Sequence, residues 1–256
     1  MPGDSRRLVI IPSYNAGWRA PEVVRKARQH WSPVWIVTDG ATDGTPALLD
    51  AVARELSGVR TIHVPLNRGK GSAVLTAVRL AAEAGFTHFL CLDSDGQHPE
   101  DRIPQFMEAS RRHPGAMILG KPVFGPDAPL IRVLWRKNSN ALTAFETLGG
   151  GIGDSLFGMR VYPIAPFLSV MEETGWARRF DFDPETAVRL CWRGVPALNL
   201  DTPVRYPSPE DGGVSHFRYL RDNVLLTWMH LRLLTVWPLR IPSILWRRYR
   251  NMDERP

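Results

Sequence analysis

The chain has 256 residues, of which 44% are hydrophobic and 23% are charged. This length and composition suit a folded domain with a sizeable core and exclude a disordered protein. The net charge is +6, but residues 217–256 hold eight arginines against three acidic residues, which leaves about +1 for residues 1–216. The basic excess therefore indicates a local surface contact, and we expect no binding of nucleic acid.

Two cysteines, Cys91 and Cys191, are too few for a disulfide framework or a zinc site. The apolar stretch near the N-terminus is far shorter than the central region of a signal peptide. The sequence has no uninterrupted apolar run of about eighteen residues, so no transmembrane helix is expected. These features predict a cytoplasmic protein.

Short apolar runs alternate with helical patterns in the first half of the chain. The runs predict strands over 8–11, 34–37, 59–64, 88–92 and 116–119, and helices are expected from Thr45 and over 72–84 and 99–112. Such alternation predicts an α/β fold, Rossmann-like, with a mostly parallel sheet and helices on both faces. Ligands bind beyond the carboxyl ends of such strands, where Asn15, Asp39, Asp93 and Asp95 fall.

The second half is less regular, and residues 154–206 are interpreted as an extension of the same domain. We therefore predict one catalytic-type domain over residues 1–216 and a distinct tail over residues 217–256.

The tail has the pattern of basic amphipathic helices. One helical face collects Phe217, Leu220, Val224, Trp228 and Leu231; Pro238 interrupts the pattern, and a second segment spans 241–249. Tryptophan and arginine on such helices suit the headgroup region of a membrane, so residues 217–250 are predicted to lie on a membrane surface. The alternative is a pair of helices that pack on the core or form a dimer.

The strongest local signal is the segment 90–98, LCLDSDGQH, in which an apolar strand ends at two closely spaced carboxylates. Mg²⁺ and Mn²⁺ prefer oxygen ligands and share their coordination with substrate phosphates. Asp93 and Asp95 are therefore predicted to hold Mg²⁺ or Mn²⁺ against a diphosphate, with Gln97 or His98 as a further ligand. An Asp-x-Asp sequence alone is weak evidence, because turns and helix caps also use it.

Two further segments indicate a nucleotide site. In VTDGATDGT, residues 37–45, Asp39 ends a strand and can accept hydrogen bonds from a base or ribose, whereas Asp43 and Gly44 suit a turn and a helix cap. In NRGKGS, residues 67–72, the backbone amides around Lys70 open a helix and favour phosphate. The segment is not a P-loop, and the chain lacks the glycine pattern of dinucleotide-binding folds.

Together, IPSYN, VTDGATDGT, NRGKGSA and LDSDGQH, in this order and spacing, resemble the inverting family-two glycosyltransferases with the GT-A fold. The resemblance is strongest to the dolichyl- or polyprenyl-phosphate sugar transferases and to related bacterial enzymes of aryl-polyene-type lipid clusters. It covers residues 8–216 and includes DSLFGMR (154–160), FDPE (182–185) and GVSHF (213–217). It implies transfer of a sugar from a UDP- or GDP-linked donor to a lipid acceptor on the inner face of the cell membrane.

The same resemblance implies roles for individual residues. The nucleotide pocket is expected to be lined by Pro12, Tyr14, Asn15 and Asp39. Asp93 would touch ribose or metal, and Asp95 with Gln97 would ligate the metal. Arg160 and His216 would lie near the donor diphosphate or an acceptor phosphate.

Three positions depart from the family pattern. Thr38 replaces a first aspartate. Lys121 replaces an arginine, and lysine cannot make the bidentate phosphate contact of arginine. His216 replaces a lysine, which makes that contact dependent on pH.

The need for a general base depends on the acceptor. We expect Lys121 or Arg160, with the metal, to stabilise the departing diphosphate. A lipid phosphate is already an anion and needs no base. A hydroxyl acceptor needs a nearby carboxylate, for which Asp183 and Glu185 are the candidates. Helix capping is an equal alternative for this pair, since Pro184 marks a helix start.

Other classes of protein remain as alternatives. A sugar nucleotidyltransferase uses a similar sheet but needs a glycine-rich, lysine-containing loop where this chain has Ser13–Gly17. A non-catalytic membrane-associated binding protein would not need Asp93 and Asp95. A nucleic-acid binder would need basic residues along a groove, yet the basic tail is rich in Trp, Leu and Ile.

Overall fold

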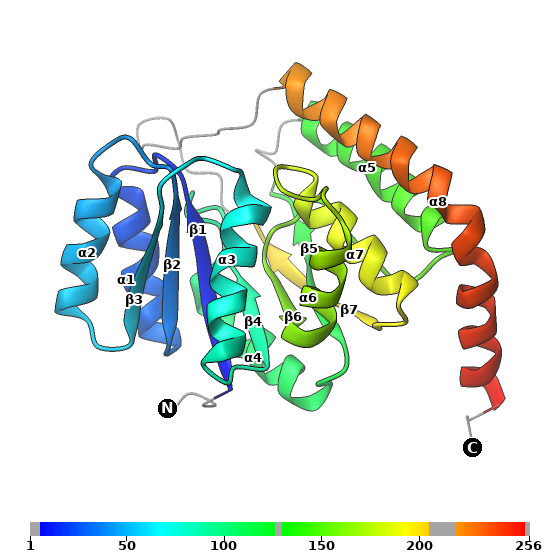
Figure 1. Ribbon diagram of the computed structural model, residues 1–256, viewed down its shortest axis with the longest axis horizontal. Helices are drawn as coiled ribbons and strands as arrows, with labels where there is room; N and C mark the ends of the chain where they lie inside the picture. The colour runs from blue at the N-terminus through cyan, green and yellow to red at the C-terminus, as the bar shows by residue number, and fades with distance from the viewer. Residues whose placement is uncertain (1–5, 126–129, 205–218, 254–256) are drawn as a thin grey trace.

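A seven-stranded sheet forms the centre of the computed structural model, which describes residues 6–125, 130–204 and 219–253. The strands follow the order β3-β2-β1-β4-β6-β5-β7, and every neighbouring pair is parallel except the two that involve β6 (Figure 1). The strands are β1 (Arg7–Ser13), β2 (Val34–Asp39), β3 (Val59–Val64), β4 (His88–Cys91), β5 (Met117–Val123), β6 (Arg160–Pro163) and β7 (Ala197–Pro203).

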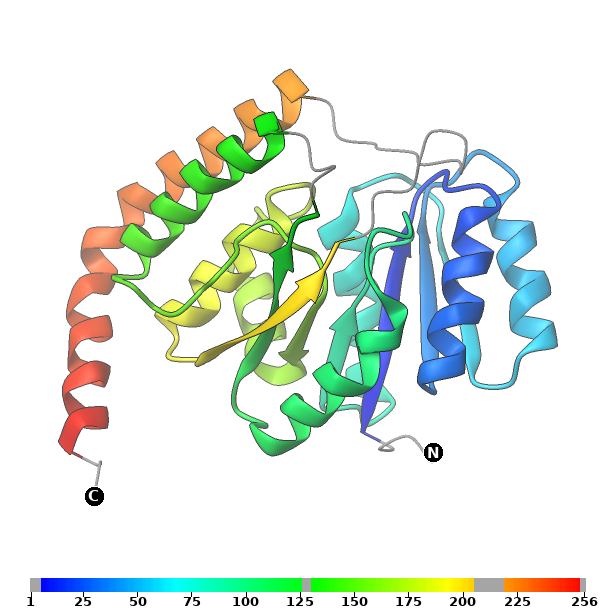
Figure 2. The same cartoon turned by 180° about the vertical axis from the view of Figure 1, so that it is seen from behind.

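Helices cover both faces of this sheet, as the sequence predicts (Figures 1 and 2). Alternate residues of β1 enter different cores, because successive side chains of a strand point to opposite faces. Leu8 and Ile10 pack with α3 (Lys70–Glu83), α6 (Ile164–Glu173) and α7 (Phe182–Trp192). Val9 and Ile11 pack with α1 (Arg19–His30), α2 (Thr45–Glu55) and α4 (Ile103–Arg112), the last preceded by the short η1 (Glu100–Arg102).

All five predicted strands are confirmed, whereas β6 and β7 were not predicted. β6 begins with Arg160, a charged residue that is fully buried in the sheet. β7 alternates only partly, contains Asn199 and Asp201, and forms the edge of the sheet beside β5. Neither segment has the continuous apolar run that identifies a buried parallel strand.

The tail forms one helix and not two: α8 runs from Tyr219 to Asp253 with Pro238 and Pro242 inside it. Prolines inside a helix remove hydrogen bonds and cause bends, and α8 bends where its C-terminal half extends beyond α7 (Figures 1 and 2). The predicted break was therefore wrong. Phe217 and the predicted boundary at residue 216 lie outside the described residues. None of the helices in the described ranges has the length and apolar character to cross a membrane.

One face of α8 packs firmly on the domain, beside α5 (Leu130–Glu146) and α7. Met229, Leu233 and Ile244 join Val188 and Trp192 of α7 in a third apolar cluster. Buried polar contacts accompany this cluster, because His230 bonds to Glu146 at 2.8 Å and to Ser139 at 3.1 Å. In the structure, α8 thus shares a core with the sheet domain.

The opposite face of α8 is apolar and exposed. Exposed apolar side chains recur along it at spacings of three, four, seven and eight positions, which keep them on a single helical face: Val224, Trp228, Leu231, Leu239, Trp246 and Tyr249. The predicted face of Val224, Trp228 and Leu231 is therefore the outward one. We call this set the exposed stripe of α8.

Shortening a side chain on the packed face should destabilise the protein. Met229 is 0% exposed and Leu231 is 52% exposed. We expect Met229→Ala to lower the free energy of unfolding by about 2–5 kcal/mol, because a buried cavity forms. Leu231→Ala should change it by about 0.5 kcal/mol or less. Thermal and denaturant unfolding measure both, and equal effects would show that α8 does not pack as described.

Candidate active site

The polar residues predicted at strand ends lie along one edge of the sheet. β1, β2 and β4 are parallel neighbours, so their carboxyl ends meet at this edge. Asn15 follows β1, Asp39 ends β2, and Asp93 and Asp95 follow β4. Pro12 is buried within β1, and Tyr14 is exposed just beyond it.

Asn15 uses its side chain to join two loops of this edge. Its Oδ1 accepts the Thr42 amide at 2.9 Å, and its Nδ2 donates to Thr42 Oγ1 at 3.2 Å. Asp43 behaves as the predicted turn residue, because it accepts hydrogen bonds from the amides of Thr45 and Gly17. The loops after β1 and β2 therefore form one framework, in which Asn15 has a holding role.

Asp39 is buried and holds the segment before α3. Its two carboxylate oxygens accept the amides of Arg68, at 2.9 Å, and Gly69, at 2.6 Å. Gly40 has φ +62°, and a Cβ on it would come within 2.2 Å of the Asn67 amide nitrogen, so only glycine fits there. In this structure both carboxylate oxygens of Asp39 hold a loop. Its predicted contact with the base or ribose of a nucleotide stays a prediction.

The amides that open α3 are also occupied. Gly71 and Ser72 both direct their amides to the carbonyl oxygen of Arg178, at 2.9 and 3.3 Å. In this structure the two amides therefore have a partner within the chain, and phosphate binding by backbone amides at this helix start stays a prediction. The first residue of α3, Lys70, instead brings a side-chain cation to the sheet edge.

Lys70 lies between two carboxylates from distant parts of the chain. Its Nζ is 2.7 Å from Asp93 Oδ1 and 2.6 Å from Asp183 Oδ2. Burial lowers the pKa of Lys70, but the charges of Asp183 and Asp93 outweigh burial and raise it well above its usual value. Lys70 is therefore a permanent cation, and we call Lys70, Asp93 and Asp183 the charged cluster.

The two carboxylates of the Asp-x-Asp segment differ in their surroundings. Burial raises the pKa of Asp93, but the charge and the hydrogen bond of Lys70 lower it, and the net shift is downward. Burial raises the pKa of Asp95, and the negative charge of Asp93 raises it further. Asp95 Oδ1 accepts the backbone amide of Gln97 at 2.9 Å. The Gln97 side chain takes no part in this hydrogen bond.

These residues fit a divalent cation that is shared with a substrate. A cation would relieve the repulsion between Asp93 and Asp95, which is the second cause of the raised pKa of Asp95. In the described ranges no group of three or more His, Cys, Asp or Glu side chains could hold a metal by itself. Mg²⁺ commonly binds through one or two carboxylates plus substrate phosphates, so two carboxylates are sufficient.

Two further residues shape the charged cluster. His98 is buried edge-on against Phe157, and its Nδ1 accepts the Asp93 amide at 3.1 Å, so it holds the loop after β4 from within. A Cβ on Gly158 would lie 2.4 Å from Asp93 Oδ2 and 2.8 Å from Lys70 Nζ. The glycine of the DSLFGMR segment therefore leaves room for the cluster, a role that the motif alone did not reveal.

Arg160 supports the site from below the surface. Its guanidinium is fully buried and donates to the carbonyl oxygens of Phe157, Asp183 and Asp154. Since these contacts use both terminal nitrogens and Nε, the predicted contact of Arg160 with the donor diphosphate has no support in this geometry. Arg160 instead positions the backbone at Asp183.

Asp183 and Glu185, predicted as a pair, point to different places. Glu185 is fully buried and pairs with Arg189 at 2.8 Å and with Arg232 of α8 at 3.0 Å. Its prediction as a base is therefore corrected, because it anchors α8 to α7. Asp183 belongs to the charged cluster, and its Oδ1 is buried without a hydrogen-bond partner.

Two predicted residues, Lys121 and His216, remain. Lys121 is exposed at the end of β5, where its Nζ is 3.9 Å from Asp201. His216 lies outside the described residues.

The comparisons with known proteins agree with this fold. Glucosyl-3-phosphoglycerate synthase from Mycobacterium tuberculosis, solved with Mn²⁺, UDP and glucosyl-3-phosphoglycerate, has a TM-score of 0.63 over 91% of this chain and 80% of its own, at 15% identity. That likeness shows a GT-A glycosyltransferase fold. Residues 8–167 match the family Glycosyl transferase family 2. The chain belongs to this family and is a glycosyltransferase.

Two relatives with assigned activities cover most of the domain. Polyprenol monophosphomannose synthase from Mycolicibacterium smegmatis is 28% identical over 201 residues, which are 74% of this chain and 72% of the relative. UDP-N-acetylglucosamine–dolichyl-phosphate N-acetylglucosaminyltransferase from Methanococcus voltae is 26% identical over 201 residues, 72% of this chain and 80% of the relative. Both are named for sugar transfer to a lipid phosphate.

Filling the space at Gly158 should impair activity without unfolding the protein. We expect Gly158→Ala to lower turnover by about tenfold or more, because small displacements of reacting groups are costly. Gly115→Ala is the matched control, since a Cβ there has no atom within 4 Å. Sugar transfer and the melting temperature are measured for both. Normal turnover in Gly158→Ala would contradict the close approach of Asp93 and Lys70.

Proposed function

We propose that this glycosyltransferase moves a sugar from a UDP- or GDP-linked donor to the phosphate of a polyprenol-type lipid at the cytoplasmic face of a membrane. The observation that carries the proposal is the charged cluster, which sets a permanent cation between two carboxylates at the carboxyl edge of the sheet. The relatives named for lipid-phosphate acceptors support the acceptor class.

The proposed reaction is a single displacement with inversion. An oxygen of the acceptor phosphate forms a bond to the anomeric carbon while the bond from that carbon to the nucleoside diphosphate breaks. The diphosphate leaves with the electron pair. No proton has to be removed from a phosphate monoester anion, so this acceptor needs no general base.

Residues of the site have distinct tasks in this proposal. Asp93 and Asp95 hold Mg²⁺ or Mn²⁺, with Gln97 as a further ligand, and the bound ion supplies positive charge for the departing diphosphate. Lys70 orients Asp93 and offers its ammonium group to phosphate oxygens. Lys121 is the candidate for a second cation at the same edge. Should the acceptor be a hydroxyl, Asp183 is the carboxylate that faces the site.

Apolar surface beside the charged cluster suits a lipid acceptor. Trp176 and Phe180 are exposed on the segment between α6 and α7, shortly before Asp183. The guanidinium of Arg232, from α8, lies 4.0 Å from the centre of the Trp176 ring. Trp228, one helical turn before Arg232, belongs to the exposed stripe. Apolar side chains therefore extend from the cluster to α8.

The exposed stripe supports a peripheral position on a membrane. It follows one face of α8 for most of the helix, and arginines such as Arg221 and Arg240 flank it. Interfacial helices combine such an apolar face with basic residues that meet anionic lipids. We therefore propose that residues 217–250 contact the membrane, and of these the structure describes residues 219–250.

Removal of divalent cations should stop the reaction. We expect a chelator to abolish transfer and Mn²⁺ or Mg²⁺ to restore it. Asp95→Asn should lower turnover by about 100-fold even with saturating metal, because a carboxylate ligand is lost. Asp101→Asn, an exposed change of the same chemistry nearby, should keep normal turnover. Release of nucleoside diphosphate measures each case, and full activity in the chelator would contradict a metal role.

The acceptor phosphate should be required. With a panel of UDP- and GDP-sugars, we expect label to pass to undecaprenyl phosphate and not to undecaprenol, because the charged cluster offers a cation for phosphate. Labelled lipid is measured after extraction. Transfer to undecaprenol at the same rate would contradict the phosphate acceptor and would assign Asp183 as a base, which Asp183→Asn would then test.

A further inference from the structure

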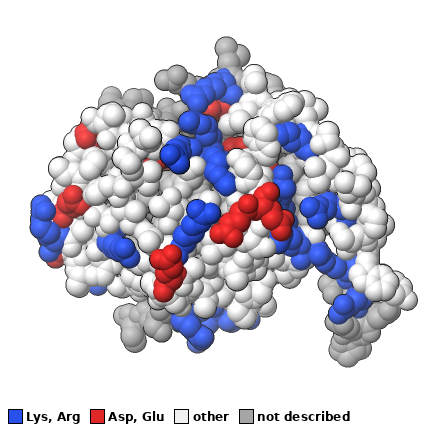
Figure 3. All heavy atoms as spheres, in the orientation of Figure 1, with Lys and Arg blue, Asp and Glu red and all other residues white. Residues whose placement is uncertain are grey.

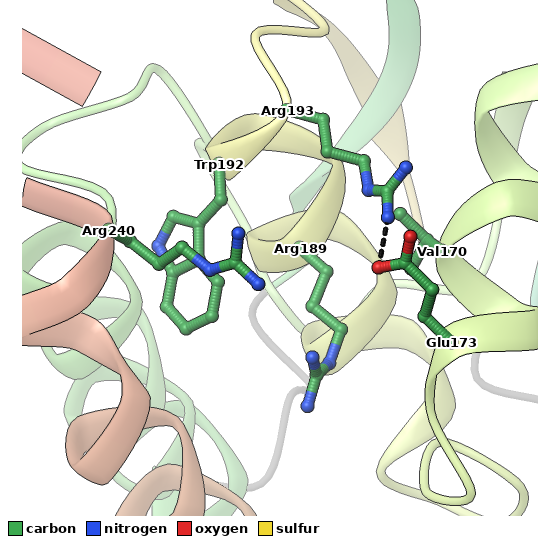
Figure 4. A pocket seen from close by; sticks show the side chains of 6 residues that line it. All are labelled: Val170, Glu173, Arg189, Trp192, Arg193 and Arg240. Atoms are coloured by element: carbon green, nitrogen blue, oxygen red, sulfur yellow. Dashed lines mark ion pairs between the residues drawn. The ribbon is translucent and has the colours of Figure 1, made fainter. Parts of the chain in front are cut away.

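A hollow with several arginines lies between α6, α7 and α8, away from the charged cluster (Figure 4). Asp183 is near the start of α7 and Arg193 follows its end, so the two sites are about 15 Å apart along the helix. The hollow is lined by Val170, Glu173, Arg189, Trp192, Arg193 and Arg240. None of these residues has a task in the proposed reaction.

The positive charge of the hollow exceeds the negative charge beside it. Arg193 pairs with Glu173 and also donates to Ser169, and Arg189 pairs with Glu185. Arg240 lies over the Trp192 ring, 6.0 Å from its centre, and has no ion-pair partner among the residues that the structure describes. Figure 3 shows basic side chains in the right-hand half of the view, with an acidic patch directly beside them.

The charges of all three arginines act at one point. A hydrogen bond from Arg193 lowers the pKa of Glu173, and the charges of Arg193, Arg240 and Arg189 lower it further. Three arginines therefore contribute positive charge around Glu173. Arginine binds phosphate through paired N–H donors, which makes phosphate the anion that suits this set.

The size and rigidity of the hollow suit a small anionic group. It encloses about 250 Å³, part of which is open solvent. Its floor is fixed, because Trp192 is buried and its indole nitrogen donates to the Glu146 carbonyl at 2.7 Å.

The half of α8 that contains Arg240 also carries exposed apolar side chains. Leu239, next to Arg240, is 80% exposed, and Trp246 stacks with Tyr249 in the same half of the helix. Arg247 donates to the Trp192 carbonyl and so fastens this half of α8 beside the hollow. A basic hollow beside exposed Leu, Trp and Tyr has the chemistry of an anionic lipid, which offers a phosphate and an acyl region together.

We propose that this hollow binds the headgroup phosphate of an anionic membrane lipid, while the exposed stripe of α8 lies in the adjoining surface of the bilayer. The inference rests on the proposed action at a membrane and assigns the hollow a lipid separate from the acceptor. Arg240 is the residue on which selectivity for anionic lipid depends most.

Flotation with vesicles tests the inference in the full chain. Wild type should bind phosphatidylcholine vesicles that contain phosphatidylglycerol more tightly than pure phosphatidylcholine vesicles. Arg240→Gln should weaken binding to the anionic vesicles by about fivefold, the usual effect of one basic residue at such a surface. Arg221→Gln removes the same charge from the same helix outside the hollow and should weaken it less. Equal binding by Arg240→Gln and wild type, or equal losses in both variants, would overturn the proposal.

Soluble ligands and a detergent assay distinguish the remaining outcomes. Glycerol 3-phosphate, at constant ionic strength, should compete only weakly with anionic vesicles. If it binds through Arg240 while vesicles do not bind, the occupant is a free phosphate and the lipid proposal is wrong. Transfer to undecaprenyl phosphate in detergent should be equal in Arg240→Gln and wild type, and a loss there would place Arg240 in the reaction and overturn the separate site. Failure of wild type to transfer would count against the proposed function alone.

Discussion

The contact of Lys70 with Asp93 and Asp183 is the constraint on which the site depends. Buried charges are costly unless they are paired, and removal of one partner leaves the others uncompensated. The ammonium group therefore ties the start of α3, the end of β4 and the start of α7 to one point. The loop that contains Gly158 must pass without a side chain, because Asp93 and Lys70 occupy that space. The same contact explains why a segment over a hundred residues from Lys70 in sequence helps to form the site.

Helix α7 connects this cluster to α8. Asp183 belongs to the cluster through its contact with Lys70, whereas Glu185, two positions later, pairs with Arg232 of α8. Residues two positions apart on a helix point to different sides. The carboxylates of Asp183 and Glu185 therefore contact different parts of the protein. Arg160 fixes the backbone between them through the Asp183 carbonyl. The position of α8 is thus coupled through one short helix to the geometry of the charged cluster.

The sequence predicted what depends on local pattern. Five strands, the Asp-x-Asp loop and the exposed face with Trp228 follow from apolar periodicity and strand ends. It did not predict the hydrogen-bond partners of polar side chains, because these depend on tertiary contacts. The side chains of Asp39 and Asn15 suit a nucleotide, but in the structure they accept hydrogen bonds from loop amides. Likewise, Pro238 suggests a helix end, yet packing of Met229, Leu233 and Ile244 on α7 stabilises the helix on both sides of the bend.

The exposed stripe and the charged cluster together constrain how the enzyme would meet a bilayer. A helix that lies flat in the headgroup region places its apolar side chains below that level and the attached domain above it. Arg232 of α8 lies over Trp176 and pairs with Asp181, two residues before Asp183, so the cluster would lie close to headgroup height. A lipid phosphate already resides at this height. The acceptor could therefore present its charged group to Lys70 while its hydrocarbon chain stays in the membrane, and the enzyme would not have to extract the lipid.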